Sequence, residues 1–177
     1  DTNVTDPQGA VYFSFIALII QSKADILQSN NWHLILNNSI QLANFIFYLT
    51  GISGIFVLFK KKGYHLYTIL ISLSILNFLP PALYFRLTMK PEVVAFALLP
   101  WAIYSIELYF QKRNINTLIF SSSIVSILLT QKASISGMVL LCLILFFSKE
   151  VRNIKNNLQI LFMGAFSTTL LLYENYK

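Results

Sequence analysis

Six apolar runs, separated by short polar or basic segments, limit what this chain can fold into. They are Ser39–Phe59, Tyr64–Leu79, Val93–Phe110, Ile115–Gln131, Ser134–Ser148 and Leu158–Tyr173. Their lengths lie at or near the roughly 17 to 25 apolar residues with which a helix crosses a bilayer. Only 11% of the residues are charged, whereas a soluble domain has about 25%. The sequence therefore predicts an all-α, polytopic transmembrane bundle of about six spanning helices, and it excludes a water-soluble globule.

The N-terminal section, residues 1–39, differs from the rest. Its apolar stretch, residues 10–20, is too short to span a bilayer, and the amphipathic residues 24–36 follow it. We expect an extracytoplasmic loop with short interfacial helices, followed by a single membrane domain over residues 40–177. The alternative is that residues 8–22 are the remaining end of a truncated spanning helix. Because the chain begins at Asp1 and ends just after an apolar run, we expect a fragment of a longer protein.

The basic residues predict the orientation. Three loops that follow alternate runs hold eight of the thirteen lysines and arginines: Lys60, Lys61, Lys62, Lys112, Arg113, Lys149, Arg152 and Lys155. The positive-inside rule makes these loops cytoplasmic and residues 1–39 external, in a multi-pass protein of a bacterial-type plasma membrane. The net charge of +6 then reflects topology, and no nucleic-acid partner is predicted. A single cysteine, Cys142, excludes a disulfide framework and a thiolate metal site.

The segment Pro80–Trp101 carries three of the few charges that fall outside the short basic loops: Arg86, Lys90 and Glu92. Residues 81–90 are expected to form a short interfacial helix that places Arg86 and Lys90 on one face. Pro91 ends that helix, and Pro91 with Glu92 favours the start of the next one. The two cations either anchor the segment to lipid head groups or hold a phosphate ligand. Glu92 either pairs with Lys90 or stabilises the helix start.

Three further outer residues have two interpretations each. Lys132 lies at a tight helical hairpin, where it contacts a lipid phosphate or merely extends to the interface. Asp1 and Asp6 lie in the outer loop, where an acid can act as a general base or bind a divalent cation, Mg²⁺ or Mn²⁺. Asp6-Pro7 is also a common turn opener.

Within the runs, Glu107 is interpreted as an end-of-helix charge near Lys112 and Arg113, although an acid inside a span is a functional candidate by default. Pro100 is expected to kink its helix and open a cavity. Small residues at helical spacing predict close helix packing in lipid: Gly51, Gly54, Ser122, Ser126 and Thr130. His33 and His65 fall on opposite sides of the membrane in this topology, so they cannot share a metal.

Three local patterns together resemble the GT-C superfamily of membrane glycosyltransferases, which take sugars from polyprenyl-phosphate carriers. One is the acid-bearing segment from Asp6 to Tyr12. The second is Arg86 to Phe96, similar to an "R…(R/K)-P-E-x-(L/V)-A" start of a mid-chain helix. The third is Leu128 to Ser134, similar to an "L-x-T-K-x-(S/G)" hairpin, with Gln131 as a one-residue departure.

This resemblance implies an inverting glycosyltransferase of the cell envelope. Asp6 or Asp1 is implied as the base that takes a proton from the acceptor hydroxyl, although the paired acids of the superfamily are absent. Arg86, Lys90 and Lys132 are implied to hold the polyprenyl phosphate, and Glu92 to orient a cation or bind a hydroxyl. The lipid bilayer and a polyprenyl-phosphate-linked sugar are the implied partners.

Other classes of membrane protein remain open at this point. A transporter or flippase would use the same outer cations for an anionic substrate, but no internal repeat is evident. An enzyme resembling O-antigen polymerases would have a similar outer basic site. A structural subunit would have no chemistry of its own.

Overall fold

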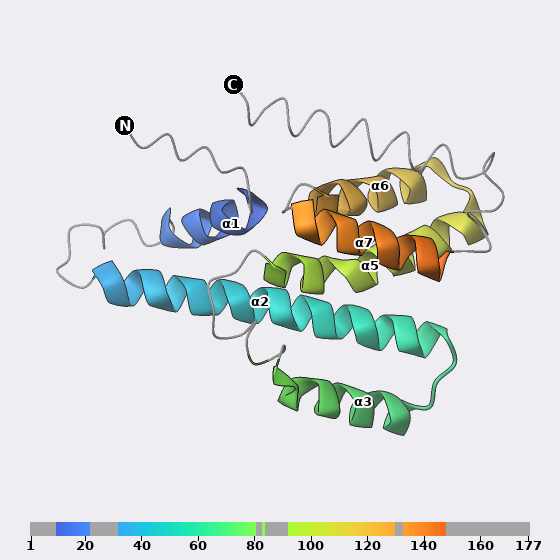
Figure 1. Ribbon diagram of the computed structural model, residues 1–177, viewed down its shortest axis with the longest axis horizontal. Helices are drawn as coiled ribbons and strands as arrows, with labels where there is room; N and C mark the ends of the chain where they lie inside the picture. The colour runs from blue at the N-terminus through green and yellow to red at the C-terminus, as the bar shows by residue number, and fades with distance from the viewer. Residues whose placement is uncertain (1–9, 22–31, 81–82, 84–91, 130–132, 148–177) are drawn as a thin grey trace.

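The computed structural model describes residues 10–21, 32–80, 83, 92–129 and 133–147. In these ranges the chain forms helices and no strands. The helices are α1 (Ala10–Gln21), α2 (Trp32–Lys61), α3 (Leu66–Phe78), α5 (Glu92–Lys112), α6 (Ile115–Leu129) and α7 (Ala133–Phe146) (Figure 1). The all-α prediction is confirmed for the described part of the chain.

Two helices, α2 and α5, form the centre of the bundle and run parallel to each other. Contacts advance along both helices in the same direction, from the middle of α2 and the first turns of α5 to the C-terminal part of each. The pairs are Gly51 with Phe96, Gly54 with Pro100, and Lys61 with Glu107. By length and hydropathy, α2 and α5 are also the two described helices that are able to span a membrane. They indicate membrane association.

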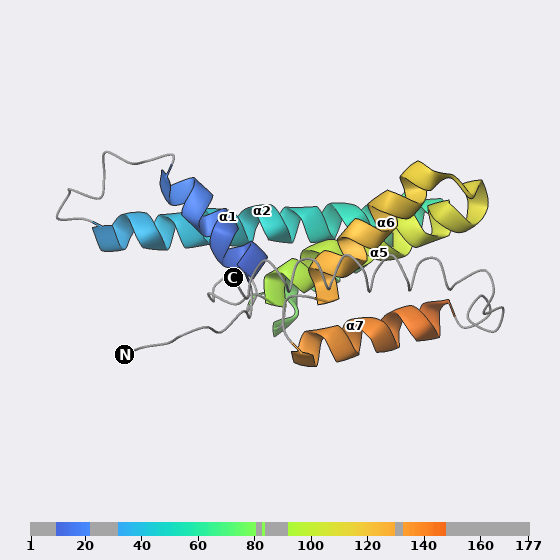
Figure 2. The same ribbon diagram turned by 90° about the horizontal axis from the view of Figure 1, so that it is seen from above.

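The other helices reverse direction around this pair. A short turn with Gly63 at φ 83° returns the chain from α2 into α3, and a two-residue link joins α5 to α6. Figure 1 shows α3 on one side of α2, with α5 on the other side and α6 and α7 beyond α5. Figure 2 shows α1 crossing the N-terminal half of α2.

These directions define two ends of the bundle. The first is named the α1 end, because α1 packs there; α2 and α5 begin at this end, and α6 ends at it. The second is named the basic end, and α2 and α5 end there. Among the described residues it carries five basic side chains: Lys60, Lys61, Lys62, Lys112 and Arg113. One core cluster lies at the α1 end, and a larger one extends along the bundle from Ala95 and Leu128 to Leu58 and Phe147. Tyr12, Ala43 and Val93 belong to the cluster at the α1 end, and Leu58, Ile106 and Phe147 to the larger one.

The predicted close packing at small residues is confirmed where the structure describes it. An added Cβ at Gly51 would lie 2.5 Å from Cε1 of Phe96, and one at Gly54 would lie 2.8 Å from Nε1 of Trp101. Ser122 and Ser126 are buried in α6, and Thr130 lies outside the described residues. Glycine is needed at both α2 positions because α5 occupies the space where a side chain would begin.

The helices differ from the predicted spans in two respects. First, α2 begins at Trp32 and runs unbroken through residue 39, whereas the sequence placed residues 24–36 on the membrane surface and the first span from Ser39. Second, α3, α6 and α7 have 13, 15 and 14 residues, shorter than a usual span. The sixth run, Leu158–Tyr173, lies outside the described residues. Residues 10–20, expected to be a short helix, are helical in α1.

Candidate functional site

Most of the predicted site residues lie outside the part of the chain that the structure describes: Asp1, Asp6, Arg86, Lys90 and Lys132. Their predicted roles therefore stay predictions. Glu92 is described, and it occupies the first turn of α5, as the sequence Pro91-Glu92 predicts. An acid in this position interacts favourably with the positive end of the helix dipole. Pro100 lies inside α5, buried, and the helix continues through it.

The α1 end brings together the described parts of the first two sequence patterns, whereas Leu128 and Leu129 of the third belong to or pack against the larger cluster. Tyr12, the last residue of the first pattern, is fully buried in one cluster with Val93 and Val94, which follow Glu92 directly. Ile127 of α6, next to the third pattern, packs against the same cluster. Segments more than 100 residues apart in sequence therefore meet at one end of the bundle.

Neutral hydrogen bonds hold the helices at this end. The Tyr12 hydroxyl donates to Oδ1 of Asn44 at 2.6 Å, in a buried bond between α1 and α2. One turn further along α2, the Tyr48 hydroxyl donates to Oδ1 of Asn77 on α3 at 2.6 Å. The Tyr48 ring also stacks on Phe96 of α5 with centroids 5.3 Å apart. Two tyrosines thus join α2 to three neighbouring helices.

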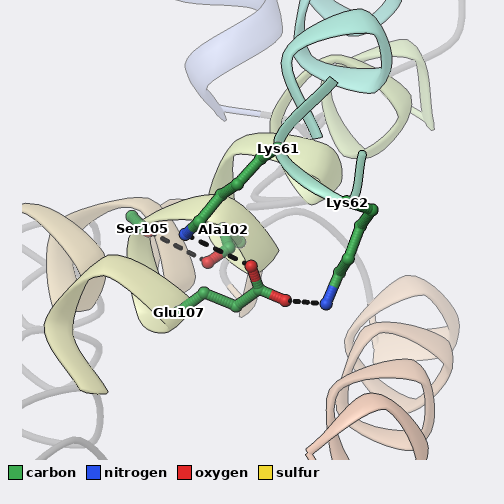
Figure 3. Close-up of polar contacts among 5 residues, drawn as sticks. All are labelled: Lys61, Lys62, Ala102, Ser105 and Glu107. Atoms are coloured by element: carbon green, nitrogen blue, oxygen red, sulfur yellow. Dashed lines mark hydrogen bonds and ion pairs between the residues drawn. The ribbon is translucent and has the colours of Figure 1, made fainter. Parts of the chain in front are cut away.

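The basic end is built differently, around one carboxylate. Figure 3 shows Glu107 of α5 between two lysines at the end of α2. Lys61 Nζ lies 3.2 Å from Glu107 Oε2, and Lys62 Nζ lies 2.5 Å from Glu107 Oε1. The Glu107 and Lys61 side chains are mostly buried, and Lys62 is 44% exposed. The helix dipole adds to this pairing, because lysines at a helix C-terminus are stabilised there.

Aromatic rings lie next to these cations. Lys61 Nζ stands 4.8 Å from the Tyr104 centroid, and Lys62 Nζ stands 5.2 Å from that of Phe146 on α7. The Arg113 guanidinium lies 5.2 Å from the Phe110 ring centroid. Cation–π attraction favours each arrangement.

The sequence interprets Glu107 as an end-of-helix charge near Lys112 and Arg113, and Glu107 does lie in the C-terminal part of α5. Its ion-pair partners are Lys61 and Lys62 from α2, which the sequence analysis did not name. The reason is the parallel packing of α2 on α5, which brings the two C-terminal turns together. Alternation of spans predicts that the Lys60 and Lys112 loops share a side, so this signal was available in the sequence.

Possible metal ligands are dispersed. Across the described ranges, no group of three His, Cys, Asp or Glu side chains lies close enough to hold a metal ion. His33 and His65 lie near opposite ends of α2, too far apart to hold one metal ion.

Comparison with known proteins adds no assignment, since no family model, no curated protein and no solved structure matches this chain. The class that the fold defines is an all-helical protein in which two described helices are long and apolar enough to span a membrane.

Proposed function

We propose that this chain is part of a multi-pass membrane glycosyltransferase, which moves a sugar from a polyprenyl-phosphate carrier to an acceptor hydroxyl at the outer face of a bacterial plasma membrane. The proposal includes about six spanning helices, with residues 1–39 outside. The α1 end would then face outward and the basic end would face the cytoplasm.

One observation supports this proposal: the described parts of two of the patterns that resemble the GT-C superfamily meet at the α1 end, and Ile127, directly before the third pattern, packs beside them. Tyr12, Val93 and Ile127 pack in or against one cluster, although the patterns are separate in sequence. A shared site requires such convergence, because a base and phosphate-binding cations must reach the same substrate.

The proposed roles follow from the chemistry of the transfer. Asp6, or Asp1, accepts the proton of the acceptor hydroxyl as the new glycosidic bond forms with inversion. The polyprenyl phosphate leaves with its bonding electron pair, and Arg86, Lys90 and Lys132 stabilise the charge that develops on it. Glu92 binds a substrate hydroxyl or orients a cation. A single described carboxylate at this end does not constitute a divalent-cation site, so no step is assigned to Mg²⁺ or Mn²⁺.

The test is sugar transfer by the protein with its complete flanking sequence, purified in detergent and supplied with a polyprenyl-phosphate sugar. Asp6→Asn should reduce the rate by about 10² to 10⁴ through loss of the base. Arg86→Ala should reduce it by about 10² to 10³ through loss of charge stabilisation.

Two matched variants control for loss of charge alone. Asp25→Asn removes an acid from the same N-terminal section, and Lys112→Ala removes a cation from the basic end; both should retain transfer. Unchanged transfer in Asp6→Asn, Asp1→Asn and Arg86→Ala would refute the proposed site. Absence of transfer from every polyprenyl-phosphate sugar, in a folded protein, would refute the proposed activity.

A further inference from the structure

We infer that the basic end is a binding surface for the phosphate head groups of anionic lipids. The inference does not depend on the proposed transferase activity, because it concerns the opposite end of the bundle. It is based on the charge balance of this end, on the layer of rings beneath the cations and on the backbone at Arg113.

The charge balance leaves an excess of cations. The described charged residues at this end are the five cations named above and one anion, Glu107, and together they give a formal charge of +4. Both oxygens of Glu107 are already engaged, one by each neighbouring lysine. Lys60, Lys112 and Arg113 are exposed. One carboxylate thus fixes the position of the lysines without neutralising the surface.

A continuous layer of aromatic rings lies beneath these cations. Phe146 beneath Lys62 contacts Phe147 at 5.4 Å between centroids, and Phe147 contacts Phe110 at 5.7 Å. Phe110 lies beneath Arg113, so the rings connect the two basic turns. Tyrosine side chains concentrate at the level of the lipid head groups, and Tyr104 beside Lys61 and Tyr109 beside Arg113 add this residue type to the layer. Cations on the outer side of such a layer are therefore level with the lipid phosphates.

The backbone at Arg113 gives a third argument. Arg113 ends α5 in the left-handed region with φ 49°, and its N–H donates to the Tyr109 carbonyl at 2.8 Å. Glycine adopts this helix-ending conformation at lower free energy than any other residue. Arg113 adopts this conformation at a cost in backbone strain, and its guanidinium lies beside the rings of Tyr109 and Phe110. A planar, weakly hydrated cation in this position suits a phosphate oxygen pair.

The positive-inside rule alone does not account for this arrangement of cations and rings. The positive-inside rule requires cations near a span, but it requires neither their attachment to a shared carboxylate nor a ring layer that joins the loops. A solvated charged face would leave the lysines free to separate. Here Lys61 and Lys62 are held together on Glu107, which lowers the entropy cost of binding an anion.

The test measures lipid binding by the purified full chain, using native mass spectrometry with phosphatidylglycerol, phosphatidylcholine or millimolar inorganic phosphate. Phosphatidylglycerol should bind more tightly than phosphatidylcholine. The combined Lys60→Gln, Lys112→Gln and Arg113→Gln variant should weaken binding by on the order of a hundredfold, from about fivefold for each cation near the surface. Raising the salt concentration should weaken wild-type binding.

Matched variants at position 111 provide the control. Gln111→Ala should bind phosphatidylglycerol as the wild type does, and Gln111→Lys should bind about fivefold more tightly. If the triple variant loses its helical circular dichroism, Lys112→Gln alone should still weaken binding about fivefold. Equal binding of both lipids, or unchanged binding in a folded variant, would overturn the inference. Displacement of the lipid by millimolar phosphate would assign the surface to free phosphate instead.

Discussion

The two ends of the α2–α5 pair are stabilised by different interactions. At the α1 end, buried neutral groups join the helices, as in the bond from Tyr12 to Asn44. At the basic end, two lysines share Glu107 beside aromatic rings. Neutral bonds between buried groups are insensitive to salt, whereas partly exposed ion pairs are screened by it. The comparison teaches that the described neutral bonds at the α1 end should be independent of ionic strength, whereas the ion pairs at the basic end should respond to it.

The largest expected effect comes from breaking the contact on which both ends depend. Gly51→Ala and Gly54→Ala should each lower the free energy of unfolding by about 1 to 3 kcal/mol, because an added methyl overlaps α5. The Gly54 variant should also displace the Trp101 indole, whose N–H donates to the Thr50 carbonyl at 2.9 Å. Unfolding in mixed detergent micelles, monitored by circular dichroism, measures the free energy of unfolding of both glycine variants.

Gly137→Ala is the matched control for these two variants. Gly137 lies in α7, and an added Cβ there meets nothing within 4 Å. Alanine should be neutral or should stabilise the helix by up to about 1 kcal/mol. Equal effects at positions 51, 54 and 137 would show that α2 and α5 do not pack as described.

The second prediction concerns the basic end alone. Glu107→Gln removes the acceptor charge from two adjacent lysines and should cost about 1 to 2 kcal/mol, a value between those of exposed and buried ion pairs. The loss should shrink as salt rises. Unfolding measured at low and high ionic strength tests this, with Lys61→Met and the double variant completing a thermodynamic cycle. A coupling near zero between Glu107 and Lys61 would contradict the prediction.

A smaller effect is expected at the α1 end. Tyr12→Phe removes the hydroxyl that donates to Asn44 and should cost about 1 kcal/mol, with no dependence on salt. Tyr67→Phe is the control, because Tyr67 is 81% exposed and should lose nothing measurable. If the Tyr12 effect varied with salt as the Glu107 effect does, the proposed difference between the ends would be wrong.

The smallest effect concerns the end of α5. Arg113→Gly should be about 0.5 to 1 kcal/mol more stable than Arg113→Ala, because glycine adopts the left-handed conformation without strain. Lys112→Gly, at a helical position, should instead be less stable than Lys112→Ala by about 1 kcal/mol. If the stability difference between the glycine and alanine variants had the same sign at positions 112 and 113, this would argue against the described backbone at Arg113.

Much of the fold could be predicted from the apolar runs. Five of them coincide with described helices, and the start of α5 at Glu92 follows from Pro91. The early start of α2 was missed because His33, Asn37 and Asn38 make its first turns resemble a surface segment. All three are exposed in the structure, so the polar side chains coexist with a continuous helix.

Less of the candidate site could be predicted, because pairing between helices is a tertiary property. Sequence spacing shows only the near neighbours, and so Glu107 was interpreted as an end-of-helix charge near Lys112 and Arg113. The ion pairs with Lys61 and Lys62 require the parallel packing of α2 and α5, which depends on the shapes of Gly51, Gly54 and the facing rings of α5. The roles of Asp6, Arg86, Lys90 and Lys132 stay predictions from sequence.

The parallel packing of α2 and α5 also has a consequence for biosynthesis. The bond from Trp101 to Thr50 joins residues 51 positions apart, and α3 lies between them in the chain. At a translation rate of about 5 to 20 residues per second, roughly 3 to 10 s separate the synthesis of Thr50 from that of Trp101. During that interval the glycine surface of α2 has no α5 to cover it. A nascent chain stalled before Glu92 would expose this surface to lipid or to the insertion machinery. Misassembled chains should therefore be detectable at this stage of synthesis.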